Sequence, residues 1–87
     1  MPDQTLAELK LSRITLLTHK EAAKLLDMAY QMNKVYPQLR VGQNLINFLH
    51  EDHPDLANKF HGGPFDFFYE NDVPTVIETF YKYYVEK

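Results

Sequence analysis

Three histidines and two aspartates lie close together near the middle of the chain and are the first candidates for chemistry. They fall within twelve residues and are His50, Asp52, His53, Asp55 and His61. Imidazole and carboxylate groups are suitable zinc ligands, and His50 and His53 would share one face if a helix continued through both. Pro54 interrupts such a helix, however, and the spacing matches no established zinc motif. A polar helix end followed by the cap of a new helix explains the same residues.

Other catalytic templates are missing from the sequence. It contains no glycine-rich phosphate loop, no G-x-S-x-G elbow, no H-E-x-x-H helix and no cysteine. The pair Gly62 and Gly63 lacks the lysine and hydroxyl residue of a phosphate loop, so it predicts a helix stop. A metal-dependent or acid–base enzyme using His50, His53 and His61 therefore stays an alternative, and we expect a protein without a cofactor that is not an enzyme.

A run of aromatic residues in the C-terminal third is the best candidate for a functional surface. Four of the five residues from 65 to 69 are aromatic, which is more than a short connection between helices needs. They are Phe65, Phe67, Phe68 and Tyr69. Phenylalanine is among the most buried residue types, so at least two of the four should be core, with Phe65 and Phe68 the first candidates. We expect the others to form an exposed patch together with Tyr81, Tyr83 and Tyr84.

Such a patch predicts a protein partner, because aromatic residues are enriched in the cores and hot spots of interfaces. The acids Asp66, Glu70 and Asp72 lie beside the aromatics and favour a basic partner surface. The partner can also be a second copy of the chain, which would give a homo-oligomer.

Nucleic-acid binding is a further alternative that the charge pattern does not favour. The net charge is −3, and the aromatics alternate with acids, whereas base-stacking aromatics normally sit in a positively charged groove. A basic side on the earlier helices could still form, from Arg13, Lys20, Lys24, Lys34 and Arg40. A solvated basic face is the commoner explanation for such residues.

Composition predicts one globular domain, residues 1–87, because 45% of the residues are hydrophobic and 24% are charged. Residues Met1 to Lys10 contain two acids and no long apolar run, which does not fit a signal peptide. No stretch approaches the roughly 20 apolar residues that span a bilayer. We therefore expect a cytoplasmic protein that makes no membrane contact, and the lack of cysteine fits a reducing compartment.

Helices should position most of the candidate residues. The pattern from Thr18 to Glu21 is a capping box, and apolar residues at helical spacing follow it up to Pro37. Three more helices are predicted, from about Leu39 to His50, from Pro54 to Phe60, and after Pro74 with a second capping box at Thr75–Glu78. Gly42 in the second of these should permit close packing against a neighbouring helix.

The start of the chain is less clearly patterned. A short helix is predicted after Asp3, with Leu6 and Leu9 on one side. Residues Leu9 to Leu17 suit either a short strand or a continuing helix, because their alternation is imperfect. The predicted fold is therefore an all-α bundle of three to four helices, with one short N-terminal strand or hairpin as an open alternative.

The run from Tyr36 to Asn47 resembles a stretch of small uncharacterised proteins of bacteriophages and their hosts. In those proteins an Arg-x-Gly-Gln-x-x-x-Asn pattern precedes Pro-x-Leu, and a glycine-containing turn and an Asp-x-Phe-Tyr-like segment follow. The corresponding residues here are Arg40, Gly42, Gln43, Asn47, Pro54, Leu56, Gly62, Gly63 and Asp66 to Tyr69. The resemblance covers residues 36–84, and the Gly-Gly-Pro insertion departs from the pattern.

The resemblance implies a small accessory protein that binds a host protein and redirects or blocks it. Arg40, Gln43 and Asn47 would lie along one side of a helix, where they either contact a partner or satisfy backbone groups within the fold. Our functional prediction is therefore protein–protein binding in the host cytoplasm. The predicted partner-binding residues are Phe67, Phe68, Tyr69, Glu70, Tyr81, Arg40 and Gln43.

Overall fold

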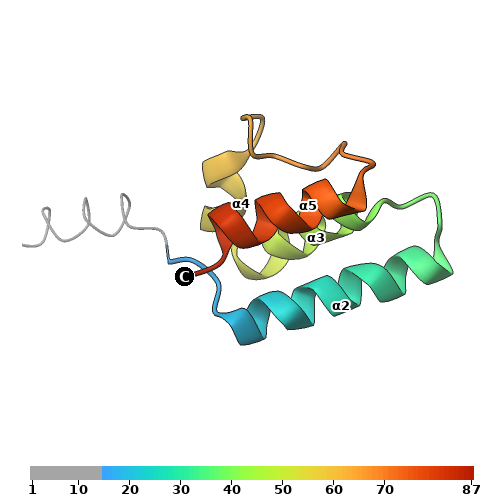
Figure 1. Cartoon of the computed structure of the whole chain (residues 1–87), viewed down its shortest axis with the longest axis horizontal. Coiled ribbons are helices and arrows are strands. Elements are labelled where there is room, and N and C mark those ends of the chain that lie inside the picture. Colours follow the sequence, from blue (N-terminus) through green and yellow to red (C-terminus); the bar gives the residue numbers. More distant parts are fainter. Residues whose placement is uncertain (1–14) are drawn as a thin grey trace, which may run out of the picture.

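The computed structural model describes residues 15–87, which form four α-helices and no strand of a sheet (Figure 1). The helices are α2 (His19–Val35), α3 (Val41–Asp52), α4 (Pro54–Phe60) and α5 (Val73–Thr79), and α5 continues directly into a π-helical turn, η1 (Phe80–Tyr84). The predicted all-α fold is confirmed. The helix predicted after Asp3 lies outside the described residues.

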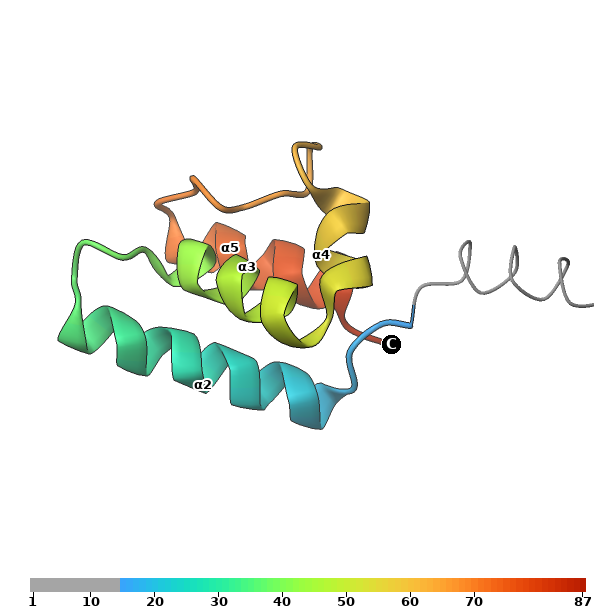
Figure 2. The same ribbon diagram turned by 180° about the vertical axis from the view of Figure 1, so that it is seen from behind.

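The four helices surround one core. α2 runs along the bundle in one direction, and α3 and α5 run back in the other, as both ribbon views show (Figures 1 and 2). Residues 61–72, which we call the crossing loop, pass over the side of α3 and α5 that faces away from α2 (Figure 2). The largest fully buried side chains come from α3, α4, α5, η1 and the residues just before α2 and just after η1. They are Leu17, Leu45, Leu49, Leu56, Val76, Phe80, Tyr84 and Val85.

The predicted capping box begins α2. The Glu21 amide donates to Thr18 Oγ1 over 3.1 Å, and the Thr18 amide donates to Glu21 Oε1 over 2.9 Å. These two bonds satisfy backbone donors that have no partner within the helix. α2 ends at Val35, because Pro37 disfavours helical geometry in the residue before it.

A buried asparagine joins α2 to α3. Asn44 is 3% exposed, and its side-chain amide donates to the backbone oxygens of Ala29 at 3.1 Å and Leu39 at 3.4 Å. The two bonds remove the cost of burying the amide and fix the register between the helices. α3 begins at Val41, two residues after the predicted start, with Arg40 as its N-cap.

The crossing loop is anchored on the bundle by Phe67. The ring is 3% exposed and lies edge-on to Phe80, with the ring centroids 6.2 Å apart. Under the Phe67 backbone lies Gly42, where an added Cβ would come within 2.5 Å of the Phe67 oxygen and 3.2 Å of Val76 Cγ2. The predicted close packing at Gly42 is confirmed, and its neighbours are the crossing loop and α5.

The predicted start of the last helix is wrong. Asp72, rather than Thr75, is the N-cap, and its carboxylate accepts from both the amide and the hydroxyl of Thr75. The helix begins at Val73 because Pro74 is favourable in a first turn, where no amide donor is needed. Glu78 therefore falls beyond the first turn and has no capping role.

The two ends of the described chain meet in a short backbone pairing. The Leu17 amide donates to the Tyr84 oxygen over 2.9 Å, and the Glu86 amide donates to the Leu17 oxygen over 2.8 Å. These bonds form one isolated parallel bridge between Leu17 and Val85. Residues 15–17 are not helical, and residues 9–14 of the predicted strand or helix lie outside the described residues.

Candidate functional site

The four aromatic residues of the crossing loop have different environments. Phe67 is buried, Phe65 and Phe68 are half-buried, and Tyr69 is 80% exposed. The prediction that Phe67 contacts a partner is therefore wrong, because its ring is buried against Phe80 and Tyr84. The prediction that Phe65 and Phe68 are core is only half right, since each keeps one side at the surface.

Tyr69 is the most exposed large apolar side chain of the described residues. Its ring contacts two other side chains, those of Arg40 and Phe68. The Arg40 guanidinium carbon lies 5.5 Å from the centroid of the Tyr69 ring and 5.9 Å from that of Phe68. The two rings meet edge to face at 4.8 Å, and Arg40 Nε donates to the Phe68 oxygen over 3.3 Å. Arg40, Phe68 and Tyr69, which we call the Tyr69 patch, thus unite three predicted site residues through cation–π and hydrogen-bond contacts.

Asp66 holds the loop that carries the patch. One carboxylate oxygen accepts the Gly62 amide at 2.8 Å, and the other accepts the Phe68 amide at 3.0 Å. Gly62 has φ +71°, a left-handed conformation that glycine adopts without steric cost. From the sequence, Asp66 belongs to an acidic fringe and to the resembling segment, with no capping role predicted, although an aspartate that caps amides of its own turn is a recognisable turn signal.

A hollow of about 180 Å³ lies between α3 and the crossing loop, which we call the α3-side hollow. Its lining residues are Ile46, Asn47, His50, His61, Asp66, Phe68 and Tyr69. The rings of His50 and His61 meet edge to face, with an angle of 76° between their planes and their centroids 6.1 Å apart. His61 Nδ1 lies 3.9 Å from an Asp66 carboxylate oxygen, so a protonated His61 would form a weak surface ion pair.

The predicted histidine cluster is not assembled. His53 lies at the junction of α3 and α4, and its Nε2 is 3.7 Å from Glu21 of α2, away from His50 and His61. Within residues 15–87 no group of three or more His, Cys, Asp or Glu side chains is placed to hold a metal ion. The separation follows from Pro54, which starts a new helix immediately after His53.

A second hollow lies on the other side of the loop, against α5, and measures about 350 Å³. We call it the α5-side hollow, and its lining residues are Pro64, Phe65, Asp66, Phe67, Tyr69, Glu70, Thr75 and Thr79. Glu70, another predicted site residue, is half-buried in this wall. Tyr69 and Asp66 line both hollows, so the exposed tyrosine stands between them.

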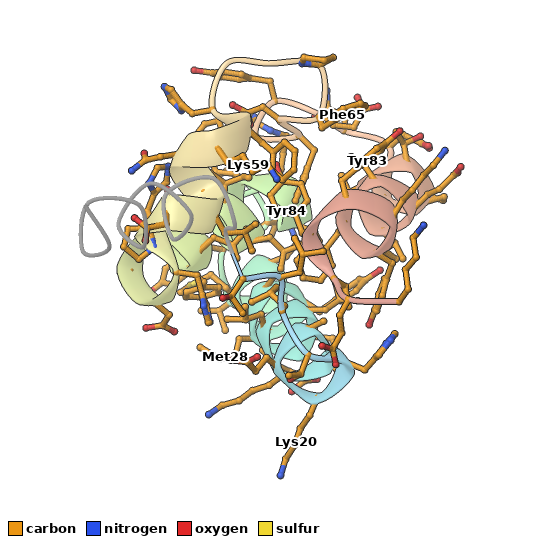
Figure 3. All side chains as sticks on the ribbon, turned by 90° about the vertical axis from the view of Figure 1, so that its left-hand side faces the viewer. Lys20, Met28, Lys59, Phe65, Tyr83 and Tyr84 are labelled. Carbon is orange, nitrogen blue, oxygen red and sulfur yellow. The ribbon has the colours of Figure 1, made fainter. Side chains whose placement is uncertain are left out.

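The C-terminal tyrosines Tyr81, Tyr83 and Tyr84 line neither of the two hollows. Tyr81 stacks on His19 at the start of α2, with ring centroids 6.5 Å apart, so the predicted grouping of Tyr81 with Tyr69 is wrong. Tyr83 stacks on Phe65 at 3.7 Å, and Figure 3 shows this pair above the inward-pointing Tyr84. Burial raises the pKa of Tyr84, and its hydroxyl donates to the Phe65 oxygen over 2.8 Å.

The polar row predicted along α3 is partly used within the fold. Arg40 donates to the loop backbone, which is the structural use that the sequence left open. Gln43 is half-buried, and Asn47 is exposed in the wall of the α3-side hollow.

The lysines of α2 are exposed, and Figure 3 shows Lys20 pointing out from the bundle.

Comparisons with protein-family models, with curated proteins and with solved structures find no match for this chain. Among the described helices, none combines the length and the apolar character needed to cross a membrane.

Proposed function

We propose that this protein acts by binding another protein through the Tyr69 patch. The observation that carries the proposal is the exposure of Tyr69, at 80%, on a loop that is held in place from several sides. An exposed aromatic ring leaves apolar surface in water, and a partner that covers the ring removes this unfavourable contact. Tyrosine and arginine, which the patch contains as Tyr69 and Arg40, are also two of the residue types most enriched in binding hot spots.

The rigidity of the loop supports the same proposal. Phe67 anchors it in the core, Asp66 binds two of its amides, and Arg40 binds the Phe68 oxygen. A side chain presented by an ordered loop loses less conformational entropy when a partner binds. The two hollows beside Tyr69 offer concave surface into which a partner can place side chains.

The sequence resemblance to small bacteriophage proteins suits an accessory role of this kind. In that role the chain binds a bacterial host protein and redirects or blocks it, and it needs no catalytic group or cofactor. The phage origin and the host partner are parts of the proposal.

The test is capture of a partner from bacterial lysates, with and without phage infection, by tagged wild type and by the Tyr69→Ala variant. Tyr69 contacts the core little, so the variant should keep its stability to within about 0.5 kcal/mol. Loss of a hot-spot tyrosine typically costs about 2 kcal/mol or more, or roughly a 30-fold weaker complex. The matched control is Tyr36→Ala, which removes a tyrosine that is 49% exposed at the end of α2.

A partner that Tyr69→Ala releases and Tyr36→Ala retains would support the proposal. A stoichiometric partner that binds the folded Tyr69→Ala protein as tightly as the wild type would contradict it, because the patch would then not be the contact surface.

A further inference from the structure

We infer that the partner inserts a lysine or arginine side chain into the α5-side hollow, beside Tyr69. This inference rests on the proposed function and adds the chemistry that the partner must supply. It concerns the wall formed by the crossing loop and the first turns of α5, which is separate from the histidine-lined hollow on the α3 side.

Charge is the first argument. Both ionisable side chains of the α5-side hollow that carry charge at neutral pH are acids, Asp66 and Glu70, and no lysine or arginine lines it. Between His61 and Tyr81 the chain carries four acids and no lysine or arginine; the acids are Asp66, Glu70, Asp72 and Glu78. The charged side chains that line the hollow are therefore both acids, and a cationic side chain is their electrostatic complement.

The second argument is that, within residues 15–87, neither Asp66 nor Glu70 forms an ion pair with a lysine or an arginine. Among the described residues the ion pairs within 4.0 Å are His53 with Glu21 and His61 with Asp66, and neither involves lysine or arginine. The Asp66 side chain is only 15% exposed, so water screens its charge less than that of a free surface acid. Arg40 approaches the Tyr69 ring but lines neither hollow.

The walls of the hollow also fit the long stem of a basic side chain. Pro64, Phe65 and Tyr69 supply apolar surface for the methylene groups, which lysine and arginine commonly bury while the charged end stays polar. The hydroxyls of Thr75 and Thr79 can accept hydrogen bonds from an ammonium or guanidinium group. Because the Thr75 hydroxyl donates its own hydrogen to Asp72, its oxygen is free to act as an acceptor.

The first experiment needs no knowledge of the partner. ¹⁵N-labelled protein is titrated with N-acetyl-arginine amide, which carries one positive side chain, and in parallel with N-acetyl-citrulline amide, which is nearly the same shape without the charge. We expect saturable amide shifts at Tyr69, Glu70 and Thr79 with the arginine probe, at dissociation constants on the order of 1–10 mM. The citrulline probe should bind at least about fivefold more weakly, because charge-assisted hydrogen bonds are the stronger ones.

Two matched variants locate the contact. Glu70→Gln removes a carboxylate from the hollow, and we expect it to weaken the arginine probe by at least about fivefold, as loss of a charge-assisted hydrogen bond should. Glu78→Gln removes an exposed carboxylate of α5 that does not line the hollow, and we expect it to leave the probe affinity within about twofold. Equal binding of the two probes, or equal effects of the two variants, would overturn the inference.

The same variants separate this inference from the proposed function. If Tyr69→Ala releases a captured partner and Glu70→Gln does not, the proposed binding function is supported. The inference that a basic side chain enters the hollow is then overturned. Release by both, with retention by Glu78→Gln, supports the two together. The remaining case is that the partner is a second copy of this chain, and light scattering tests it by measuring the oligomeric state. If the wild type is a dimer and Glu70→Gln is a monomer, a second copy fills the hollow, and a separate partner protein is ruled out as its occupant.

Discussion

At the scale of single residues, Gly42 decides how closely the crossing loop can lie on the bundle. Its missing side chain lets the Phe67 backbone pass directly over α3, and this approach sends the Phe67 ring into the core and Tyr69 into solvent. Phe67 and Tyr69 point in different directions because a turn separates them, in which the Glu70 amide donates to the Phe67 oxygen over 3.1 Å. The candidate site therefore depends on a glycine that belongs to neither hollow.

Gly42→Ala should destabilise the fold by about 1–3 kcal/mol, the usual cost of overpacking, although alanine regains up to about 1 kcal/mol of helix propensity. The added Cβ would meet the Phe67 oxygen at 2.5 Å, and backbone cannot move aside as a flexible side chain would. Chemical denaturation measures the loss. Gly63→Ala is the control, because its Cβ would be 3.4 Å from the Phe60 oxygen, an ordinary contact. A Gly42→Ala protein as stable as this control would contradict the packing argument.

At the scale of elements, the start of α2 combines a cap with a contact to the α3–α4 junction. Glu21 accepts the Thr18 amide and faces His53 across the helices. The hydrogen bond from the Thr18 backbone lowers the pKa of Glu21 below its ordinary value of 4.5, the Thr18 side-chain hydrogen bond lowers it further, and the charge of His53 adds to the effect. Glu21 therefore stabilises the folded protein when it is ionised.

Because the folded-state pKa of Glu21 is the lower one, its contribution is present above pH 4.5 and is lost as the pH falls through the folded pKa. Glu21→Gln keeps a side chain that can accept the Thr18 amide but removes the charge. We expect the variant to be less stable than wild type at pH 7, and the difference in melting temperature to shrink as the pH falls from 4.5 through the folded-state pKa. Thermal melts across this range test the prediction. A difference that stays constant with pH would show that the charge of Glu21 has no role.

At the scale of the whole molecule, the pairing of Leu17 with Val85 joins the entry into α2 to the exit from η1. Both side chains are 1% exposed and pack in the same core. The π-helical turn Phe80–Tyr84 ends in the extended residue Val85, and the backbone bonds on either side of it tie residues almost 70 positions apart. Such a contact stabilises the fold only when all the helices are in place.

Val85→Ala should lower stability by about 2 kcal/mol, from about 0.8 kcal/mol for each buried methylene plus a cavity term. For a domain of this size that corresponds to a fall in melting temperature of roughly 10 °C. Val35→Ala is the matched control, since that valine is 67% exposed at the end of α2 and should change stability by less than about 0.5 kcal/mol. Equal melting temperatures of the two variants would contradict a closing role for Val85.

Local signals in the sequence determined the four helices and most of their ends. These signals act within a few residues of the helix end that they determine, so the sequence shows them without a structure. They are the Thr18–Glu21 capping box, Pro37 after α2, Pro54 at the start of α4, and Gly62, which has a positive φ after α4. The start of α5 was missed because two caps were available within one turn. Tyr69 is predicted as a site residue from the aromatic run, and Arg40 from the family resemblance and its place along one side of a predicted helix.

Tertiary structure alone decided which aromatic residue is buried and which residues meet. Burial of Phe67 instead of Phe65 or Phe68 follows from the approach of the loop to Gly42, a contact between positions 25 residues apart. The contact of Arg40 with Tyr69 has the same origin, because it also joins the start of α3 to the crossing loop. Periodicity describes neighbours along the chain, whereas these outcomes depend on how α3, α5 and the crossing loop pack against one another.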